Sequence, residues 1–386
     1  MKISLKKYES VIGDILFAIL GGILVLGGLG SNNPVWIFYT GGTFAVVLII
    51  YIFRKNRRVI FPPHFIFYLT FLLSSLTSIL WSLNKQMSYE VFILLFSGAL
   101  FWLLAYNADI HADIHKEEKI VNLEEWINSL IIYLGLLFGI LYLYAKFSHD
   151  YLTTHSFSLY LQSEVNHNHV GDLEALVLTF IAANIILKKV KNIILMYFAG
   201  IFSAVIIILS GSRSAILGLI AGLIFILNAK GILDRKKLIL AALLAVGVIF
   251  ILISGGKTTL FSREYYFQAI GGFINHPFGV GMGNFSEISL DPKNHILGFS
   301  KFTKFVHNII LEAVSGAGLL AIPFIIWFIK VHRDAFKVKS TEKMIFAAIF
   351  ICLSVNFFFD YIYFAPTLFW LWFTCLGLSQ AWVRRK

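Results

Sequence analysis

The stretch that decides the fold is residues 193–229, IILMYFAGIFSAVIIILSGSRSAILGLIAGLIFILNA, in which two apolar runs flank a single cation, Arg213. Each run has about the length that a helix needs to cross the hydrocarbon of a bilayer. In lipid, a helix satisfies its backbone groups internally. An arginine held at a bilayer boundary costs about a few kcal/mol unless an anion or dipole compensates it, so Arg213 is expected to mark a site.

Similar apolar runs recur along the whole chain of 386 residues, of which 58% are hydrophobic and 14% charged. A soluble core cannot hide that much apolar surface, so the composition predicts an all-α, polytopic integral membrane protein. No internal repeat or separate soluble domain is evident, and residues 1–386 are expected to form one membrane domain. Cys352 and Cys375 both fall in spans and form no disulfide or zinc pattern. We predict about twelve spans, near residues 11–30, 34–53, 61–81, 88–106, 126–146, 170–187, 193–210, 213–229, 237–255, 306–329, 342–361 and 364–382. The first span lacks a cleavage signature and is expected to be retained.

The formal net charge of +11 is explained by topology rather than by nucleic-acid binding, because most of the 32 lysines and arginines fall on alternate loops. This pattern follows the positive-inside rule and predicts that both termini are cytoplasmic. Two long loops, about 147–169 and 256–305, then lie on the outer side. His111, Asp113 and His115 have a spacing that a metal site can use, but a solvated cytoplasmic loop explains them better and no metal is expected.

The outer loop between spans nine and ten is expected to be partly helical. An amphipathic segment from Arg263 to Ile270 precedes the helix breakers Gly271, Gly272 and Pro277, and is expected to lie on the outer membrane interface. Residues 278–285, FGVGMGNF, carry glycines at alternate positions, which permit close backbone approach or positive φ. No preceding strand supports a dinucleotide loop.

Four segments on the outer side carry chemistry. In chain order they are Asn166-His167-Asn168-His169 at the start of span six, the Ser212-Arg213 turn, Arg263 with the glycine run, and His307-Asn308-Ile309-Ile310-Leu311-Glu312 at the start of span ten. Taken together, over residues 160–330, they resemble the O-antigen ligase and polymerase superfamily. The resemblance rests on the Asn-containing helix start, the Ser-Arg turn between adjacent spans, the Arg-led loop ending in Pro277-Phe278-Gly279-Val280-Gly281-Met282-Gly283, and His-Asn-x-x-Leu-Glu followed by Gly316-x-Gly318.

The resemblance implies a metal-independent, inverting glycosyltransferase of lipopolysaccharide biosynthesis in the cell inner membrane, with its active site on the periplasmic side and no cofactor. The donor would be a glycan on undecaprenyl diphosphate, and the acceptor a sugar hydroxyl of lipid A-core. The catalytic residues that carry over are His307, Arg213 and Arg263. Substrate contacts are expected from Asn166, His167, His169, Asn308, Glu312, Gly281 and Asn284.

The residue types suit this chemistry on physical grounds. Guanidinium groups make bidentate, charge-assisted hydrogen bonds to phosphate oxygens, so Arg213 and Arg263 are predicted to clamp the diphosphate. Histidine titrates near neutrality and is the usual general base, the role predicted for His307, with Glu312 as its orienter.

Several alternatives stay open. The same donor chemistry serves a polymerase whose acceptor is a second lipid-linked repeat, and a transporter of a lipid-linked anion would use the arginines for binding alone. Arg213 can also snorkel to headgroup phosphates, and the asparagines next to the histidines can act only as helix caps. Gly218 and Gly222 have the spacing of close helix packing. Asp172, Glu174 and Asp360, which an apolar setting would penalise, are each expected to have a polar or cationic partner.

Overall fold

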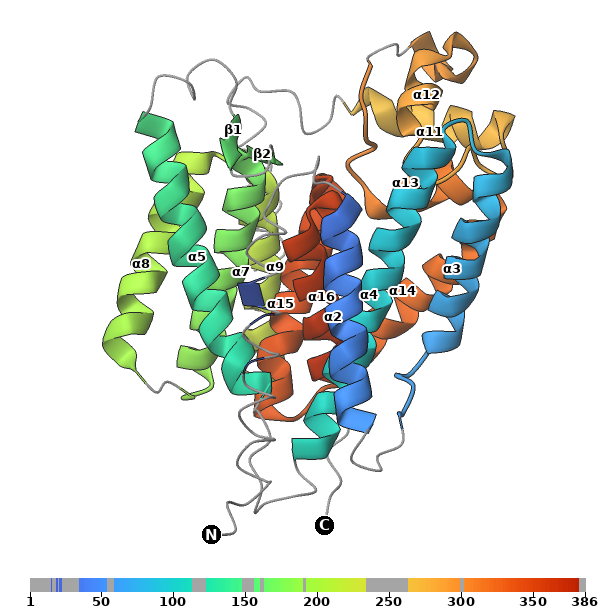
Figure 1. The fold of residues 1–386 in the computed structure, drawn as a ribbon. Coiled ribbons are helices and arrows are strands. Elements are labelled where there is room, and N and C mark those ends of the chain that lie inside the picture. The colour runs from blue at the N-terminus through green and yellow to red at the C-terminus, as the bar shows by residue number, and fades with distance from the viewer. Residues whose placement is uncertain are drawn as a thin grey trace.

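The computed structural model describes residues 35–53, 59–112, 123–147, 156–159, 163–189, 192–233, 263–298 and 302–381, with the isolated residues 15, 19, 21 and 22. These residues form an upright bundle of helices, with a small cap of short helices at one end (Figure 1). The long helices are α2 (Val35–Phe53), α3 (Phe65–Ser78), α4 (Lys85–Ala112), α5 (Leu123–Phe147), α7 (His167–Ile186), α8 (Ile193–Ser210), α9 (Arg213–Ala229), α14 (Ile322–Ala335), α15 (Thr341–Phe359) and α16 (Pro366–Gln380).

The prediction of a helical membrane protein is confirmed. Among the described residues, six helical segments are long and apolar enough to cross a membrane. The predicted spans at 193–210 and 213–229 coincide with α8 and α9. The predicted span at 237–255 lies outside the described residues and the one at 11–30 lies almost wholly outside them, so the total of twelve stays a prediction. His111 was expected in a loop but lies in the last turn of α4, while Asp113 and His115 lie outside the described residues.

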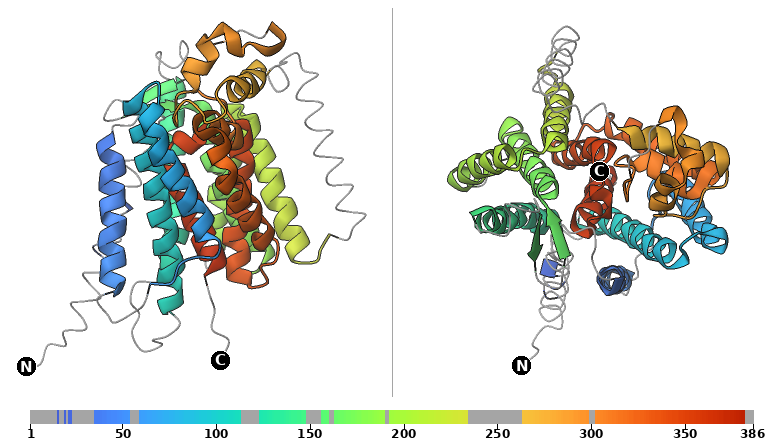
Figure 2. Two further views of the ribbon diagram at one scale, coloured as in Figure 1. Left: turned by 90° about the vertical axis from the view of Figure 1, so that its right-hand side faces the viewer. Right: turned by 90° about the horizontal axis from the view of Figure 1, so that it is seen from above.

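The centre of the bundle is formed by α15 and α16, which lie between the green helices α5, α7 and α8 and the light-blue pair α3 and α4 when seen from above (Figure 2). Nearly every side chain of α16 is buried, as expected for a helix that is apolar on all sides. Gly98 of α4 allows α16 to approach closely, because a Cβ there would lie 2.6 Å from the Phe373 ring. Gly377 does the same from the other side, at 2.8 Å from the Trp102 carbonyl oxygen.

The predicted close packing at Gly218 and Gly222 is confirmed. A Cβ on Gly218 would lie 2.7 Å from the Cys352 carbonyl oxygen of α15, and one on Gly222 would lie 3.2 Å from the Ala348 carbonyl oxygen. Small residues at this spacing let two helix backbones meet. The α9–α15 pair therefore forms a tight unit inside the bundle.

The span predicted at 306–329 is interrupted. It begins as α13 (Ile309–Ala317), passes through the 3₁₀ turn η6 (Gly318–Ala321) and continues as α14. Gly318 has φ +59°, and a Cβ there would lie 2.1 Å from the Pro277 carbonyl oxygen. The Leu319 amide donates to that same oxygen at 2.8 Å instead of continuing the helix ladder. The interruption thus exists because the glycine run packs against this point.

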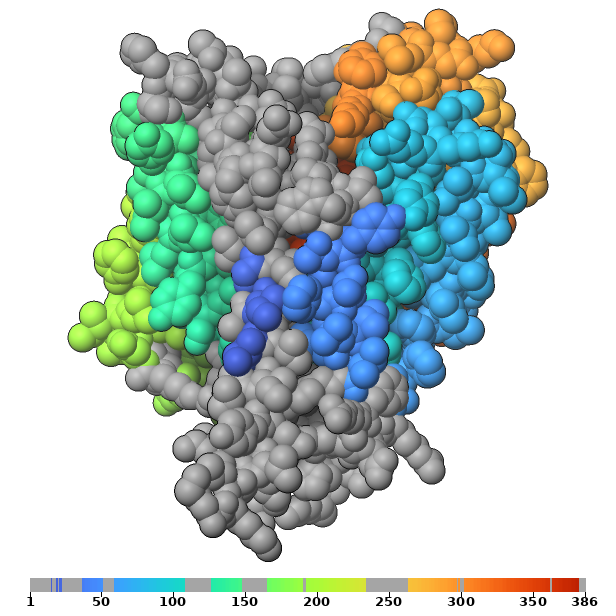
Figure 3. Space-filling view, in the orientation of Figure 1, coloured from blue at the N-terminus to red at the C-terminus, as the bar shows by residue number. Residues whose placement is uncertain are grey.

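The cap consists of α11 (Glu264–Asn275), α12 (Phe285–Leu290) and the 3₁₀ turns η4 (Pro292–Asn294) and η5 (Ile296–Gly298). In the space-filling view its orange surface rests on the light-blue surface of α3 and α4 (Figure 3). The prediction that Gly271 and Gly272 end the helix is wrong, because α11 runs through them to Asn275. These glycines serve packing: a Cβ on Gly271 would lie 2.4 Å from the Asn294 carbonyl oxygen, and one on Gly272 would lie 2.7 Å from Ile288.

A short antiparallel hairpin, which the all-α prediction did not include, pairs β1 (Ser156–Leu159) with β2 (Ser163–Asn166). It belongs to the predicted outer loop 147–169 and leads directly into α7. The hairpin lies at the same end of the bundle as the cap (Figure 1).

Candidate active site

A cavity of about 310 Å³ opens at the capped end of the bundle, and the residues around it come from five separate segments. It brings together the three residues predicted to be catalytic, Arg213, Arg263 and His307. The full lining is His167, Asn168, Gly211, Arg213, Ser214, Arg263, Tyr265, His307, Phe359 and Asp360.

The N-termini of two helices contribute to this lining. His167 and Asn168 form the first turn of α7, and Arg213 and Ser214 form the first turn of α9. Helix N-termini carry partial positive charge, which favours anions. The amides of Asn168 and Ala215 are already capped by Asn166 and Ser212. With two arginines added, the cavity is suited to a negatively charged group.

The turn that carries Arg213 is fixed onto α7. Asp172 is fully buried and accepts hydrogen bonds from the Ser214 hydroxyl at 3.2 Å and the Ser212 hydroxyl at 3.4 Å. Gly171 makes room for the turn, since a Cβ there would lie 2.5 Å from the Ser210 hydroxyl oxygen. The polar partners expected for Asp172 are therefore two serines, Ser212 and Ser214. Through them Asp172 positions the residues on both sides of Arg213.

His307 lies two residues before the first residue of α13, in a strained backbone conformation. Its φ is +56°, a left-handed value that costs a non-glycine residue about 1–3 kcal/mol and is concentrated at functional sites. The next residue, Asn308, caps α13 by accepting from the amides of Ile310 and Leu311, each at 3.0 Å. The cap predicted for Asn308 is thus present, and it sets where the helix begins and where His307 points.

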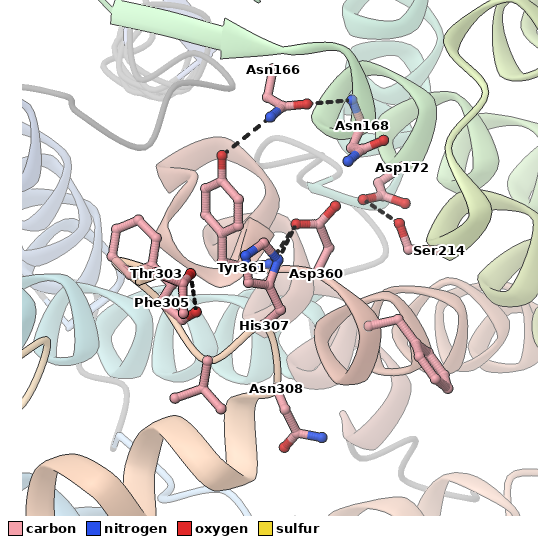
Figure 4. Close-up of polar contacts among 12 residues, drawn as sticks. Asn166, Asn168, Asp172, Ser214, Thr303, Phe305, His307, Asn308, Asp360 and Tyr361 are labelled. Atoms are coloured by element: carbon pink, nitrogen blue, oxygen red, sulfur yellow. Dashed lines mark hydrogen bonds and ion pairs between the residues drawn. The ribbon is translucent and has the colours of Figure 1, made fainter. Parts of the chain in front are cut away.

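The imidazole of His307 pairs with Asp360, which follows the last residue of α15. Nδ1 of His307 lies 3.3 Å from Oδ1 of Asp360, and their side chains are 25% and 4% exposed. Figure 4 shows the two groups facing each other, with Tyr361 beside them. Because a carboxylate accepts hydrogen bonds, Nδ1 is the donor, and Nε2 is left as the ring nitrogen that can take a proton.

The charge of Asp360 is stabilised in this setting. Burial alone would raise the pKa of Asp360, but the hydrogen bond and charge of His307, together with the charge of His169, hold that pKa below its usual value. Asp360 is therefore ionised near neutral pH. The structure gives His307 as the cationic or polar partner that was expected for Asp360.

Glu174 meets the same expectation less well. Its carboxylate lies against Gly135 and Gly139 of α5 and makes no hydrogen bond of normal geometry to a described residue, and its polar neighbour is Ser203.

Arg263 lines the cavity, but its hydrogen bonds go to the protein. Its Nη2 donates to the Phe359 carbonyl oxygen at 2.6 Å, and its Nη1 donates to the His307 carbonyl oxygen at 3.3 Å and to the Tyr266 hydroxyl at 3.1 Å. The rings of Tyr265, Tyr266 and Phe359 surround its guanidinium, with centroids 5.9, 5.5 and 5.7 Å away. Nε of Arg263 makes no hydrogen bond to a described residue, so the phosphate clamp expected at Arg263 stays a prediction, made by a side chain whose Nη1 and Nη2 are already bonded to the protein.

Aromatic rings fill the space around the histidines. The Tyr361 ring makes edge contacts with His307 and His169, at centroid distances of 4.7 and 4.9 Å. Its hydroxyl accepts from the Asn166 amide at 3.3 Å, while Asn166 also caps α7 through the Asn168 amide at 2.9 Å (Figure 4). Asn166 and His169 thus contact Tyr361 rather than the cavity, whereas His167 and Asn168 line the cavity.

Tyr265 contributes a neutral hydroxyl to the cavity wall. Burial raises the pKa of Tyr265 to about 12, against an opposing effect of the Arg263 charge. Its ring also lies 5.2 Å from that of His307, measured between centroids. Tyr265 can therefore donate a hydrogen bond across the whole physiological pH range.

Of the seven predicted contact residues, only His167 lines the cavity. Asn166, His169 and Asn308 lie next to lining residues, and the remaining three lie elsewhere. Glu312 is buried, where Oε2 accepts from the Val306 amide at 3.1 Å and the Tyr363 hydroxyl at 3.2 Å, so Asp360 and not Glu312 orients His307. Gly281 has φ +93° and packs against Ser82, which joins the cap to the bundle. Asn284 is buried and donates to the hydroxyls of Ser82 and Ser88 at 2.7 and 2.9 Å.

Sequence reasoning did not assign Asp360 to His307, nor Tyr265, Phe359 and Asn168 to the lining. Asp360 had one usable signal, an acidic residue at the outer end of a span. The others are common residue types at membrane interfaces, and only the folded arrangement distinguishes them.

Comparison with known proteins adds no relative: no family model, characterised protein or solved structure matches the chain. The resemblance to O-antigen ligases and polymerases therefore rests on the motifs quoted above.

Proposed function

We propose that this protein is a membrane glycosyltransferase that moves a glycan from a lipid diphosphate to a sugar hydroxyl. The observation that carries the proposal is that one cavity at the end of a membrane bundle contains Arg213, two helix N-termini and the His307–Asp360 pair. An anion site next to an oriented histidine is the combination that this reaction needs. The motif resemblance adds undecaprenyl diphosphate as the carrier and the periplasmic face of the inner membrane as the location.

The donor half of the reaction is assigned to Arg213 and the first turns of α7 and α9. When the bond between the glycosyl C1 atom and the phosphate oxygen breaks, the lipid diphosphate leaves with additional negative charge. Preorganised donors aimed at developing charge contribute most in sites from which water is partly excluded. A guanidinium fork and helix amides can fill that role without moving during the reaction.

The acceptor half is assigned to His307. The acceptor hydroxyl oxygen attacks C1, and its proton passes to Nε2 of His307, while Asp360 holds Nδ1–H and stabilises the imidazolium that forms. A positioned general base is typically worth about 10² to 10⁴ in rate. Attack from the face opposite the leaving diphosphate gives inversion at C1.

The acceptor distinguishes a ligase, which uses lipid A-core, from a polymerase, which uses a second lipid-linked repeat. We favour the ligase as the first candidate, following the motif resemblance. A transporter of the same anion would use the arginine and helix termini for binding and would form no glycosylated product, which separates it from a transferase by experiment.

The deciding experiment supplies purified protein in proteoliposomes with one lipid-linked glycan and both acceptors, and follows products by mass spectrometry. We expect one acceptor to be glycosylated by the wild type and neither by His307→Ala. Movement of the donor across the bilayer without any glycosylated product would reject the transferase and favour transport.

A further inference from the structure

Arg263 is placed where it can hold the two halves of the His307–Asp360 pair together. Its Nη1 donates to the His307 carbonyl oxygen, and its Nη2 donates to the carbonyl oxygen of Phe359, the residue before Asp360. One guanidinium thus connects the chain on both sides of the pair.

Tyr266 repeats the same connection one turn along α11. Its hydroxyl lies 3.2 Å from the His307 carbonyl oxygen and 2.9 Å from the Phe358 carbonyl oxygen. Asn308 adds a contact from its amide to the Phe358 carbonyl oxygen at 3.4 Å. The carbonyl groups that receive these bonds belong to the last turn of α15 and to the left-handed residue His307.

Elementary electrostatics explains why a cation stands there. The last carbonyl groups of a helix have no partner within the helix and carry partial negative charge, so a nearby cation stabilises them. Asp360 follows that same helix end, which is an unfavourable place for a carboxylate. Arg263 donates to the Phe359 carbonyl oxygen at this helix end, and His307 offsets the charge of Asp360.

The aromatic cage around Arg263 limits its alternatives. Three rings lie within 6 Å of its guanidinium carbon, and the group is held by cation–π contacts as well as by hydrogen bonds. Turning the fork toward a bound phosphate would break the bonds to Phe359 and His307. The His307 carbonyl oxygen would keep the Tyr266 hydroxyl, but the Phe359 carbonyl oxygen would lose its side-chain donor, which costs about 1–3 kcal/mol.

We propose that Arg263 is a positioning residue, which together with Tyr266 fixes the separation and ring orientation of His307 and Asp360, and that donor binding is left to Arg213. This inference rests on the proposed function for its catalytic consequence. The effect of Arg263 and Tyr266 on the orientation of His307 can be observed without any turnover.

The test compares Arg263→Gln with Arg213→Gln, using Arg333→Gln as a control for losing one arginine at an exposed site, where the side chain is 59% exposed. Protein with ¹⁵N-labelled histidine is placed in nanodiscs, and the His307 signals are assigned by their loss in His307→Ala. Binding of undecaprenyl diphosphate is measured on the same samples by native mass spectrometry.

We expect wild type, Arg333→Gln and Arg213→Gln to keep one His307 tautomer, protonated at Nδ1. We expect Arg263→Gln to give a mixture of both tautomers. Arg213→Gln should weaken donor binding by about tenfold or more, equal to about 1.4 kcal/mol, while Arg263→Gln should change it by less than about threefold. Tyr266→Phe, a milder change, should give a smaller but detectable second tautomer.

An unchanged His307 spectrum in both Arg263→Gln and Tyr266→Phe would overturn the proposal. A loss of donor binding in Arg263→Gln as large as in Arg213→Gln would overturn it as well, because Arg263 would then act on the donor directly. If the protein has no transferase activity, the tautomer result still decides whether Arg263 and Tyr266 fix the orientation of His307. If Arg263→Gln does not fold, Tyr266→Phe carries the test alone.

Discussion

Nδ1 of His307 and Oδ1 of Asp360 lie 3.3 Å apart. His307 stands two residues before the start of α13, and Asp360 directly follows the end of α15. Helix ends that meet in this way place side chains at the surface of a bundle without cutting into its core. The pair therefore combines a nearly buried carboxylate with a histidine that a substrate can reach. This relationship gives the first two predictions.

Replacing His307 by alanine should abolish transfer while leaving the protein in the membrane. The reason is that the base which accepts the hydroxyl proton is lost, with an expected fall in turnover of about 10² to 10⁴. Turnover is measured in proteoliposomes, and the amount of folded protein is checked by size-exclusion chromatography in detergent. Full activity in folded His307→Ala would reject the general-base role.

Asp360→Asn keeps the shape of the side chain but removes its charge. The amide can present its NH₂ group to Nδ1 and so favour the wrong tautomer of His307, with Nε2 protonated. We expect at least about a tenfold fall in turnover with little change in the KM for the donor, since an interaction made in the transition state is lost. A raised KM with unchanged turnover would place Asp360 in donor binding instead.

Much of the fold follows from the sequence, because long apolar runs leave few alternatives in lipid. The predicted ends of α8 and α9 agree with the structure to the residue, and the sequence also predicted the Asn308 cap. The break at Gly318 was not, because it depends on a loop that arrives from the cap. Periodicity along one segment carries no information about such a contact.

The site was predicted in part for the same reason. Arg213 and His307 stand in local motifs, whereas the partner of His307 depends on which helix end lies beside it in space. Glu312 is close to His307 in sequence, yet its carboxylate points to Val306 and Tyr363. Neighbouring positions in a chain are therefore a weak guide to an acid–base pair.

Arg213→Lys should impair transfer although it keeps the positive charge. A lysine ammonium is a point charge without the planar fork that binds two phosphate oxygens at once. We expect the KM for the lipid donor to rise about tenfold, or about 1.4 kcal/mol, with a smaller effect on the KM for the acceptor. Near-normal kinetics in Arg213→Lys would mean that charge alone suffices at this position.

The pH dependence of stability should reveal the ionised state of Asp360. Its folded-state pKa is lowered relative to the unfolded value of about 3.9, so its contribution to stability is present above about pH 4 and is lost as the pH falls through the folded-state value. The titratable groups that interact with it are His307, His169, Asp172, Tyr265, Tyr266 and Tyr363. We expect wild type to exceed Asp360→Asn in melting temperature at pH 6, and this difference to shrink toward pH 3. A difference that is constant over this range would contradict the assignment.

Gly281→Ala tests whether the glycine run is a structural joint rather than a substrate contact. Gly281 has φ +93°, and a Cβ there would lie 2.3 Å from the Ser82 hydroxyl oxygen, so alanine introduces both backbone strain and a clash between the cap and the bundle. We expect a loss of about 1–3 kcal/mol or more in stability. Thermal unfolding in detergent, followed by tryptophan fluorescence, measures it. Gly200→Ala is the matched control, since a Cβ there meets only ordinary contacts at 3.5 Å, and it should be neutral or slightly stabilising because alanine favours the helix. If Gly281→Ala melts like wild type but binds the donor poorly, the glycine contacts substrate, and the packing seen at Ser82 is not what requires it.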